Sequence, residues 1–538
     1  MPKKNKLRKN SKVEISNEQS VNSLFMKLQK IIEYKHLGFI FAISYSIILG
    51  VISLSLHKIG DYGVETDFYW NYVPAAQQFL KGIVQIEQFH GPLYPMVLSV
   101  FGLVFGDFFT GGIILGLVSA AFVIYFSFET LKNIFSPLVA APVTLLIILN
   151  PIFIQYTYSA GTDMFFIALV SAAVFFFFRT NQFNTTNILL ASFFGGLSYL
   201  TRYNGLFLFS FVIVILFINY WKIDFKKRLI VSTLFISVFI LTISPWGIYC
   251  LKEKGSFFYN ENYKNIAYEL YGKGKIGWDE FWFKESKSFT SISQVILKDP
   301  GLFISNTLNN IPDHYLGDME KLTGWHIGLF IALGFFLLLF NKPLKKINTI
   351  GFAYLLVNFF FFALLLLLFY GERFSMFLIP FYCSIAVSTI LNRNNPVTEK
   401  IPAALRIILL SILVCITAVK AFNYNSAIIN SGPNEILVIK DWFNKNIKPP
   451  QDEVIIAARK AHIAYYLNMK FKPLPLEDNY NDFITTLRNN NVKYLYFSEI
   501  EAQLRREFIS LLDPQSEHPG LTALVFTSYP PAVLYKIE

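Results

Sequence analysis

The chain has 538 residues, of which 54% are hydrophobic and only 15% charged, whereas soluble domains carry about 25% charged residues. This composition excludes an ordinary soluble protein and predicts a polytopic membrane protein. The formal net charge of +11 does not indicate a nucleic-acid partner, because Lys and Arg accumulate in the cytoplasmic loops of membrane proteins. Cys250, Cys383 and Cys415 are too scattered to form a metal site or a disulfide framework.

Apolar runs along the chain predict about eleven transmembrane helices, each close to the roughly 20 residues that cross a bilayer. The first run shows no cleavage site, so we expect an uncleaved span rather than a signal peptide. The predicted spans lie near residues 37–56, 109–131, 137–156, 163–179, 187–201, 204–220, 229–250, 325–341, 349–370, 373–391 and 404–422. Residues 93–106 are apolar but too few to span, so we expect a helix that lies in the interface.

Basic segments set the predicted orientation. The segments 1–36, 221–228, 341–348 and 393–400 fall on one side of the eleven-span arrangement, which is therefore the cytoplasmic side. The predicted parts are a basic cytoplasmic arm at 1–36, a transmembrane domain at 37–424 with external loops 57–108 and 251–324, and an extracytoplasmic domain at 425–538. The chain is thus predicted to be a multi-pass protein of the cell membrane with a cytoplasmic N-terminus.

The tail is predicted to be a small α/β domain. "EILVIKDWFNKNI" is typical of a helix, with Asn434 as its N-cap. "EVIIAA", "YLYFS", "ALVFTS" and "AVLYKI" are short β-rich runs separated by turns or helices. The acidic stretch "LEDNYNDF" (476–483) is interpreted as the capped start of a helix rather than as a cation-binding loop.

Two acids mark the outer ends of the predicted spans. The loop 57–108 is far longer than a connector and holds Glu65 and Asp67 before "FYWNYVPAAQQFLKG", which is typical of an amphipathic helix resting on the membrane. Asp67 either caps that helix or acts as a general base. Asp163 begins a span, where a lipid-facing carboxylate costs at least about 2.5 kcal/mol; the alternative there is a capped helix start, with Thr162 the better capping residue. Together the two acids also suit a divalent cation.

Polar residues in the same outer segments complete the candidate site. "YLTRYNGLF" contains Arg202 and Asn204, and "YGERFSMFLIPFY" contains Glu372 and Arg373. Arginine is unexpected in short outer turns, and its guanidinium matches the geometry of phosphate oxygens. Arg373 pairing with Glu372, or extending its charge to the interface, is the alternative. The first external loop adds Glu65, Tyr69 and His90 as candidate substrate-binding residues, although a lone His is more often structural.

The order of these motifs resembles the C-type glycosyltransferases, in particular bacterial members related to the dolichyl-phosphate-mannose–protein mannosyltransferases. The resemblance covers nearly the whole chain. It rests on "ETDFYWNYVPAAQQFLKG", "HGPLYPMVL", "GTDMFF", "YLTRYNG" and "ERFSMFLIPFY", and on "ARKAHIAYYLNMKFKPLP" with "VKYLYF" in the tail. Two departures favour a bacterial or archaeal member: Thr66 separates the two acids that adjoin in many members, and the loop 251–324 is too short for the large insert of the eukaryotic enzymes.

The resemblance implies a sugar transferase that uses a polyprenyl-phosphate-linked donor and a protein, lipid or glycan acceptor outside the cytoplasm. Asp67 would take the acceptor's proton, with Asp163 as the second catalytic acid, and the arginines would stabilise the departing phosphate. Membrane lipids are expected partners, nucleic acid is not, and no cofactor is required apart from the open question of a cation at Asp67 and Asp163. Two alternatives share these features: a transporter or flippase of lipid-linked saccharide, which lacks support because no related halves are visible, and a polysaccharide polymerase or ligase.

Overall fold

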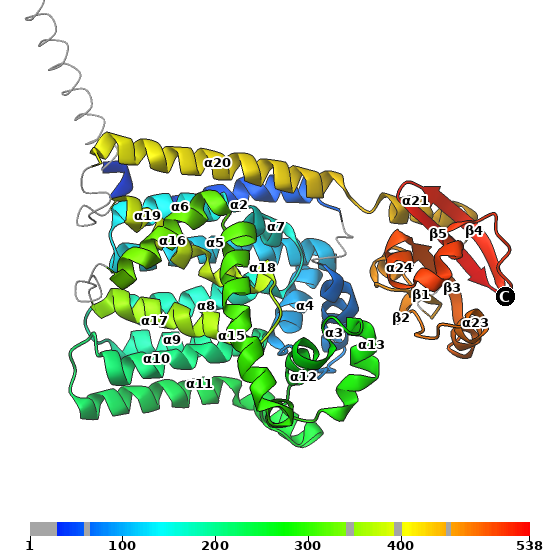
Figure 1. Cartoon of the computed structure of the whole chain (residues 1–538), viewed down its shortest axis with the longest axis horizontal. Helices are drawn as coiled ribbons and strands as arrows, with labels where there is room; N and C mark the ends of the chain where they lie inside the picture. The colour runs from blue at the N-terminus through cyan, green and yellow to red at the C-terminus, as the bar shows by residue number, and fades with distance from the viewer. Residues whose placement is uncertain (1–29, 59–64, 341–348, 392–400, 448–452) are drawn as a thin grey trace, which may run out of the picture.

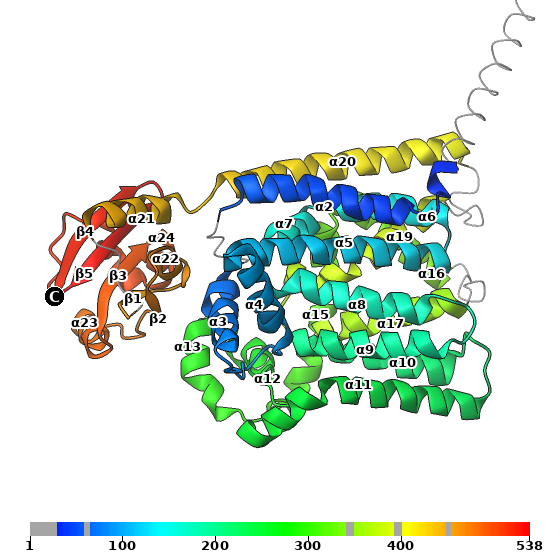
Figure 2. The same cartoon turned by 180° about the vertical axis from the view of Figure 1, so that it is seen from behind.

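The structure is a computed structural model that describes residues 30–58, 65–340, 349–391, 401–447 and 453–538. Most of these residues are helical, and a five-stranded sheet lies in the C-terminal part. In Figures 1 and 2 the long helices run side by side, and the C-terminal domain lies beyond one end of the helix bundle. The predicted fold class is therefore confirmed at this level: a mainly helical protein with a small C-terminal α/β domain.

Apolar helices form the bundle. They are α2 (Leu37–Leu56), α5 (Phe108–Ile134), α6 (Pro137–Ile148), α7 (Pro151–Tyr158), α8 (Thr162–Phe178), α9 (Thr185–Thr201), η2 (Tyr203–Phe209), α10 (Ser210–Ile213), η3 (Val214–Ile218), α11 (Phe225–Lys254), α16 (Trp325–Phe340), α17 (Thr349–Leu365), α18 (Glu372–Ser375), η8 (Met376–Leu378), α19 (Ile379–Leu391) and α20 (Ala403–Asn430). Each predicted apolar segment coincides with helix in this set. The bundle core is one large cluster of buried aliphatic and aromatic side chains.

Helix length gives fewer spans than the sequence predicts. In the described part of the chain, five helical segments are long and apolar enough to cross a membrane, or six if the pair α6 and α7, bent by 61°, is one broken span. The break falls at Asn150 and Pro151, where the proline ring cannot continue the helical hydrogen bonds. Several of the remaining apolar helices, among them α8, α16 and α17, are shorter. The predicted number of eleven spans is therefore not confirmed.

Short helices from the two long loops gather at the end of the bundle that is nearest the C-terminal domain, as the labels α3, α4, α12 and α13 show (Figures 1 and 2). The first loop contains η1 (Phe68–Tyr72), α3 (Val73–Leu80) and α4 (Leu93–Phe105), and the second contains α12 (Tyr263–Ala267), η4 (Tyr268–Gly272), α13 (Trp278–Phe283), η5 (Glu285–Ser288), α14 (Ile292–Lys298), α15 (Pro300–Gly317) and η6 (Asp318–Leu322). The 13 residues of α4 extend about 20 Å, less than the roughly 30 Å of a bilayer core. Its placement in the interface stays a prediction.

The C-terminal domain is a mixed sheet with helices on both faces. Its elements are α21 (Asn434–Asn446), β1 (Ile455–Ala458), α22 (His462–Tyr466), β2 (Lys470–Pro473), α23 (Tyr480–Asn489), β3 (Val492–Ser498), α24 (Glu499–Leu504), η9 (Arg506–Leu512), β4 (Leu521–Ser528) and β5 (Pro531–Ile537). The strand order is β2-β1-β3-β5-β4; β1 pairs in parallel with β2 and β3, and β5 pairs antiparallel with β3 and β4. Alternate side chains of β3 pack on α21 and α22 or on α23 and η9, as expected for a strand buried on both faces.

Of the two helix starts predicted in the tail, one is confirmed and the other is not. Asn434 is the first residue of α21 rather than its cap, and Pro433 takes the cap position without a side-chain bond. The interpretation of "LEDNYNDF" as a capped helix start is confirmed, because the Asn479 side chain accepts hydrogen bonds from the backbone of Asn481 and Asp482. The short strand β2 was not predicted.

Candidate active site

Glu65 anchors the start of the first external loop. Its carboxylate is fully buried and accepts a hydrogen bond of 3.0 Å from the backbone N–H of Ala160. His57 Nε2, just after α2, lies 2.9 Å from the same oxygen, and the Tyr69 hydroxyl donates to the other at 3.4 Å. A buried carboxylate needs such partners. Glu65 therefore fixes the chain two residues before Asp67 instead of pointing into a cavity.

Asp67 stands at the N-cap position of η1, yet its side chain makes no capping bond. The capping interpretation of this acid is therefore wrong. Its carboxylate is partly exposed and has no hydrogen bond or ion pair within the residues that the structure describes. Asp67 nevertheless lies within electrostatic reach of Tyr72, Arg373 and Lys460. Asp67 is therefore an acid without a described hydrogen-bond or ion-pair partner, within electrostatic reach of two cations.

Asp163 lies in the first turn of α8, where Gly161 holds the cap position and Thr162 makes no capping bond. Its carboxylate forms an ion pair with Arg202 Nη1. The same guanidinium nitrogen lies 3.4 Å from the hydroxyl of Thr162, to which Tyr72 is also bonded at 3.3 Å. The first turn of α8 is thereby joined to the end of α9 and to η1.

The part of the first loop that precedes α4 is held by its backbone against the turn that contains Arg202. His90 and Arg202 form an isolated antiparallel β-bridge. At Gly91 a Cβ atom would meet the carbonyl oxygen of Leu200 at 2.0 Å, so only glycine permits this close approach. The "HGPLYP" motif therefore positions Arg202, a role that the sequence alone did not reveal.

A hollow of about 270 Å³ lies beside the Asp163–Arg202 ion pair. Four predicted residues line it, and apolar side chains form the remaining wall: Asp163, Arg202, Asn204 and Arg373, with Phe166, Ile167, Phe361, Phe374 and Phe377. The guanidinium carbons of Arg202 and Arg373 lie 5.7 and 4.7 Å from the centre of the Phe374 ring. Such cation–π contacts hold the two like-charged guanidinium groups against one ring and leave their N–H groups available as hydrogen-bond donors.

Arg373 has no ion pair within 4.0 Å in the described part of the chain, and in particular none with its neighbour Glu372. The predicted alternative of a simple Glu372–Arg373 pair is therefore wrong. The negative charges of Asp163 and Asp67 both act on Arg373. Two acids that are distant in sequence therefore both lie within electrostatic reach of Arg373, which lines the hollow.

Other predicted residues lie away from this hollow. Tyr69 is buried against the C-terminal domain, with ring centres 4.8 Å from His462 and 5.0 Å from Tyr465. Glu372 stands beside Arg373 in α18 but does not line the hollow. Glu65 is the anchor described above. The structure therefore brings together Asp163, Arg202, Asn204 and Arg373, with Asp67 nearby.

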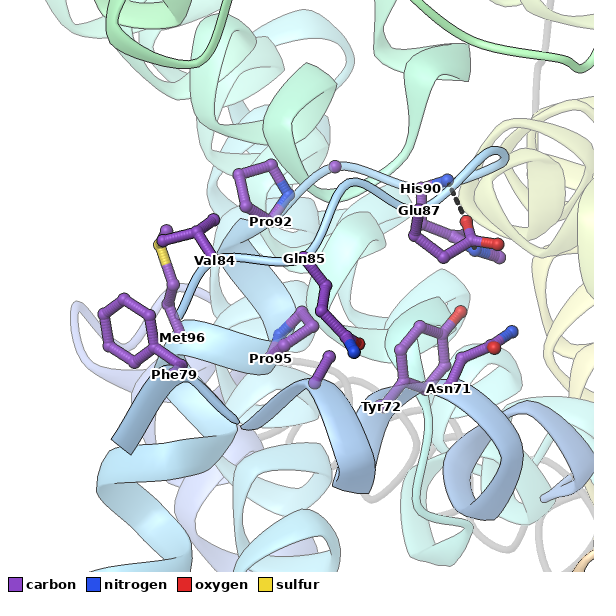
Figure 3. A pocket seen from close by; sticks show the side chains of 12 residues that line it. Asn71, Tyr72, Phe79, Val84, Gln85, Glu87, His90, Pro92, Pro95 and Met96 are labelled. Carbon is purple, nitrogen blue, oxygen red and sulfur yellow. Dashed lines mark hydrogen bonds and ion pairs between the residues drawn. The ribbon is translucent and has the colours of Figure 1, made fainter. Parts of the chain in front are cut away.

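His90 lines a second pocket of about 390 Å³ between η1, α3 and the following loop (Figure 3). Its Nδ1 atom lies 3.2 Å from a carboxylate oxygen of Glu87, which also accepts the backbone N–H of Phe89 and His90. Tyr72 belongs to both regions, because its ring packs 5.3 Å from His90 and its hydroxyl bonds Thr162. Tyr72 therefore connects the second pocket to Thr162, the residue before Asp163 of the hollow.

The donor set for a divalent cation is incomplete. Nowhere in the described ranges do three or more His, Cys, Asp or Glu side chains gather as metal ligands would. Asp163 is already paired with Arg202, and a cation would have to displace that arginine. The residues present therefore do not fit a metal held by Asp67 and Asp163.

Sequence reasoning missed two charged positions near the site. Asp318 is fully buried in η6 and accepts a hydrogen bond of 2.9 Å from Tyr382; burial raises the pKa of its carboxyl to about 7. Lys460, in the turn between β1 and α22, lies near Asp67 and Arg373. The signal for Lys460 was the basic pair in "ARKAH" directly after a buried strand, but nothing local connects it to residues almost 400 positions earlier.

Comparisons with known proteins identify a protein family and solved structures that the chain resembles. The model of the dolichyl-phosphate-mannose-protein mannosyltransferase family matches residues 89–249, a stretch that contains Asp163 and Arg202. ArnT from Cupriavidus metallidurans bound to undecaprenyl phosphate aligns with a TM-score of 0.54 and 12% identity, over 93% of this chain and 98% of that one. The chain has the C-type glycosyltransferase fold. The resemblance predicted from the sequence is confirmed.

Further structural likenesses agree with this fold. Apo ArnT gives a TM-score of 0.57 at 13% identity, covering 92% of this chain and 97% of that one. The oligosaccharyltransferase AglB from Archaeoglobus fulgidus, in complex with an inhibitory peptide and a dolichol-phosphate, gives 0.53 at 14% identity, covering 92% and 74%. No curated protein sequence matches the chain. The C-type fold and the apolar helices agree with the prediction of a multi-pass membrane protein.

Proposed function

We propose that the chain is a membrane glycosyltransferase that moves a sugar from a polyprenyl-phosphate-linked donor to an acceptor on the extracytoplasmic face. The observation that carries this proposal is the position of Asp67. Its carboxylate has no hydrogen bond or ion pair in the described part of the chain, and its charge, like that of Asp163, acts on Arg373, which lines the hollow. The fold supports it, because ArnT and AglB of the same fold hold undecaprenyl phosphate and dolichol-phosphate.

The proposed reaction is a displacement at the anomeric carbon. Asp67 takes the proton from the acceptor hydroxyl, or a similar nucleophile, as its oxygen forms the new bond to that carbon. The bond between the anomeric carbon and the carrier phosphate breaks, and its electron pair leaves with the phosphate oxygen. Attack opposite the leaving group inverts the configuration, and polyprenyl phosphate is released as the second product.

Arg373 is the proposed main phosphate ligand, because its guanidinium lines the hollow without an ion pair to a described residue. A fixed cation aimed at the leaving oxygens stabilises the charge that develops there. Arg202 provides a second cation, which Asp163 holds in orientation. Asn204 lines the same wall and offers an amide to the sugar or phosphate. His90, in the neighbouring pocket, is the proposed contact on the acceptor side.

The test is a transfer assay with the purified full-length protein and a panel of sugars on polyprenyl phosphate. Release of polyprenyl phosphate together with glycosylation of an acceptor supports the proposal, and the Asp67→Asn variant is the control for base catalysis. Parallel reactions with EDTA report on a cation, which we expect to be dispensable. Movement of the intact donor across vesicles without transfer would favour a flippase instead.

The similarity to an oligosaccharyltransferase supports one alternative function, which uses the same transfer reaction with a different donor. A ligase or polymerase would use a lipid-linked oligosaccharide rather than a single sugar. The panel therefore includes both donor sizes. Transfer only from the larger donor would replace the monosaccharide proposal while leaving the roles of Asp67 and Arg373 unchanged.

A further inference from the structure

The C-terminal domain docks on the first external loop through specific side chains. The Tyr465 hydroxyl donates a hydrogen bond of 3.0 Å to Asp107, the residue before α5. Phe471 in β2 packs 4.8 Å from Trp70, and His462 packs 4.8 Å from Tyr69. Ala461 is buried in the same apolar cluster as Phe68, Tyr69 and Tyr72. The turn between β1 and α22 therefore rests on the helix that follows Asp67.

The other side of this turn is tied to the second external loop. Arg459 lies 3.7 Å from Asp279 of α13, and its backbone N–H donates to Glu501 at 3.0 Å. Lys460 stands between these two attachments. Its position is thus set from both sides, by Arg459 on α13 and by Ala461 on η1.

Lys460 lies within electrostatic reach of Asp67, Asp279, Arg373 and Arg459. It is partly buried, yet it forms no hydrogen bond or ion pair within 4.0 Å among the described residues. Asp279 is the partner of Arg459, and Asp67 is the proposed base. Burial, and then the charge of Arg459, lowers the pKa of Lys460, while the carboxylates of Asp279 and Asp67 act in the opposite direction.

We propose that Lys460 binds the phosphate of the lipid-linked donor, so that the C-terminal domain completes the active site instead of standing apart from it. Arg373 from the bundle and Lys460 from the domain then hold the same anion from two directions. A phosphate between them would relieve the repulsion among the clustered cations and supply the partner that Lys460 lacks. This inference rests on the proposed function.

The experiment measures binding of undecaprenyl phosphate to the purified full-length protein, with undecaprenol as the uncharged probe. Lys460→Gln should weaken undecaprenyl phosphate about tenfold or more, the loss of one charge-assisted contact, and should leave undecaprenol binding unchanged. Lys460→Arg should restore much of the affinity, because it keeps the cation. Lys445→Gln, at an exposed position of α21, is the matched control and should bind both lipids as the natural protein does.

The outcomes separate this inference from the function on which it rests. If the natural protein binds undecaprenyl phosphate no better than undecaprenol, the proposed function fails. If Arg373→Gln weakens the phosphate-dependent binding and Lys460→Gln does not, only the role of Lys460 is overturned. If Lys460→Gln changed only the KM for the acceptor, the role of Lys460 would also be overturned. Lys460 would then bind an anionic group of the acceptor and not the phosphate of the donor. Equal loss of both lipids would mean that Lys460 supports domain docking only.

Discussion

Asp163 and Arg202 form an ion pair that joins the first turn of α8 to the end of α9. Both side chains are only 12% exposed, so neither charge is well solvated without the other. By contrast, Asp67 has no such partner in the described residues. Asp163 and Asp67 have similar sequence contexts but different structural roles, because only Asp163 holds an ion pair. Substitutions can measure this difference.

Asp163→Asn should lower both stability and activity. The change leaves the Arg202 charge without its partner, and an unsatisfied buried group costs roughly 1–3 kcal/mol. We expect a lower melting temperature of the detergent-purified protein, together with weaker donor binding as Arg202 reorients. A variant with unchanged melting temperature would show that the ion pair adds nothing to the folded state.

Asp67→Asn should lower the rate without lowering stability. The amide has nearly the same size, and the carboxylate it replaces makes no described hydrogen bond. Loss of a general base costs roughly a hundredfold or more in turnover, while the melting temperature should stay that of the natural protein. Full turnover in this variant would end the assignment of Asp67 as the base.

Arg373→Lys should weaken the donor more than the acceptor. Lysine keeps the positive charge but lacks the planar fork that binds two phosphate oxygens, and it cannot stack on Phe374 in the same way. The expected loss is about ten- to a hundredfold in donor affinity or rate. Varying each substrate in turn separates the two effects, and equal dependence on both in variant and natural protein would leave Arg202 as the phosphate ligand.

Asp318→Asn should remove part of the pH dependence of stability. The pKa of Asp318 is about 7 in the folded protein, raised from 3.8 by burial, so between these values the folded state holds a proton that the unfolded state has lost. Stability should therefore fall as pH rises from about 4 to about 7, by at most about 1.4 kcal/mol per pH unit. Melting temperatures between pH 5 and pH 8 should fall less in the variant.

The matched control for Asp318 is Asp441→Asn, at an exposed position of α21. This variant should follow the natural protein at every pH. If Asp318→Asn also follows it, the buried carboxyl is not the source of the pH dependence.

Gly91→Ala should disrupt the site, although Gly91 does not line the hollow. The new methyl group would overlap the Leu200 carbonyl, so the β-bridge between His90 and Arg202 would have to open. We expect lower stability and loss of transfer activity. Gly432→Ala, where nothing lies within 4 Å of the added atom, should leave both unchanged; equal tolerance at Gly91 would mean that the motif does not position Arg202.

Much of the architecture follows from local patterns. Apolar runs predict helices because burial in lipid or protein core depends on composition over about 20 residues, and each of the eleven predicted segments overlaps with helix in the described residues. Their number as spans was not confirmed, since several of these helices, such as α8 with 17 residues, are shorter than the roughly 20 residues that cross a bilayer. The C-terminal strands β1, β3, β4 and β5 were predicted from β-rich runs, whereas the polar strand β2 was not.

The sequence by itself determined the membrane class, the family resemblance and the residues that gather at the hollow: Asp163, Arg202, Asn204 and Arg373. These are charged or polar residues at the ends of apolar helices, and their cost in that setting makes them visible without a structure. Only the tertiary structure decided that Glu65 is an anchor, that Asp67 caps nothing, and that Lys460 lies within electrostatic reach of Asp67 and Arg373. Those roles depend on contacts between segments far apart in the chain, and no local pattern encodes which distant partner a side chain will meet.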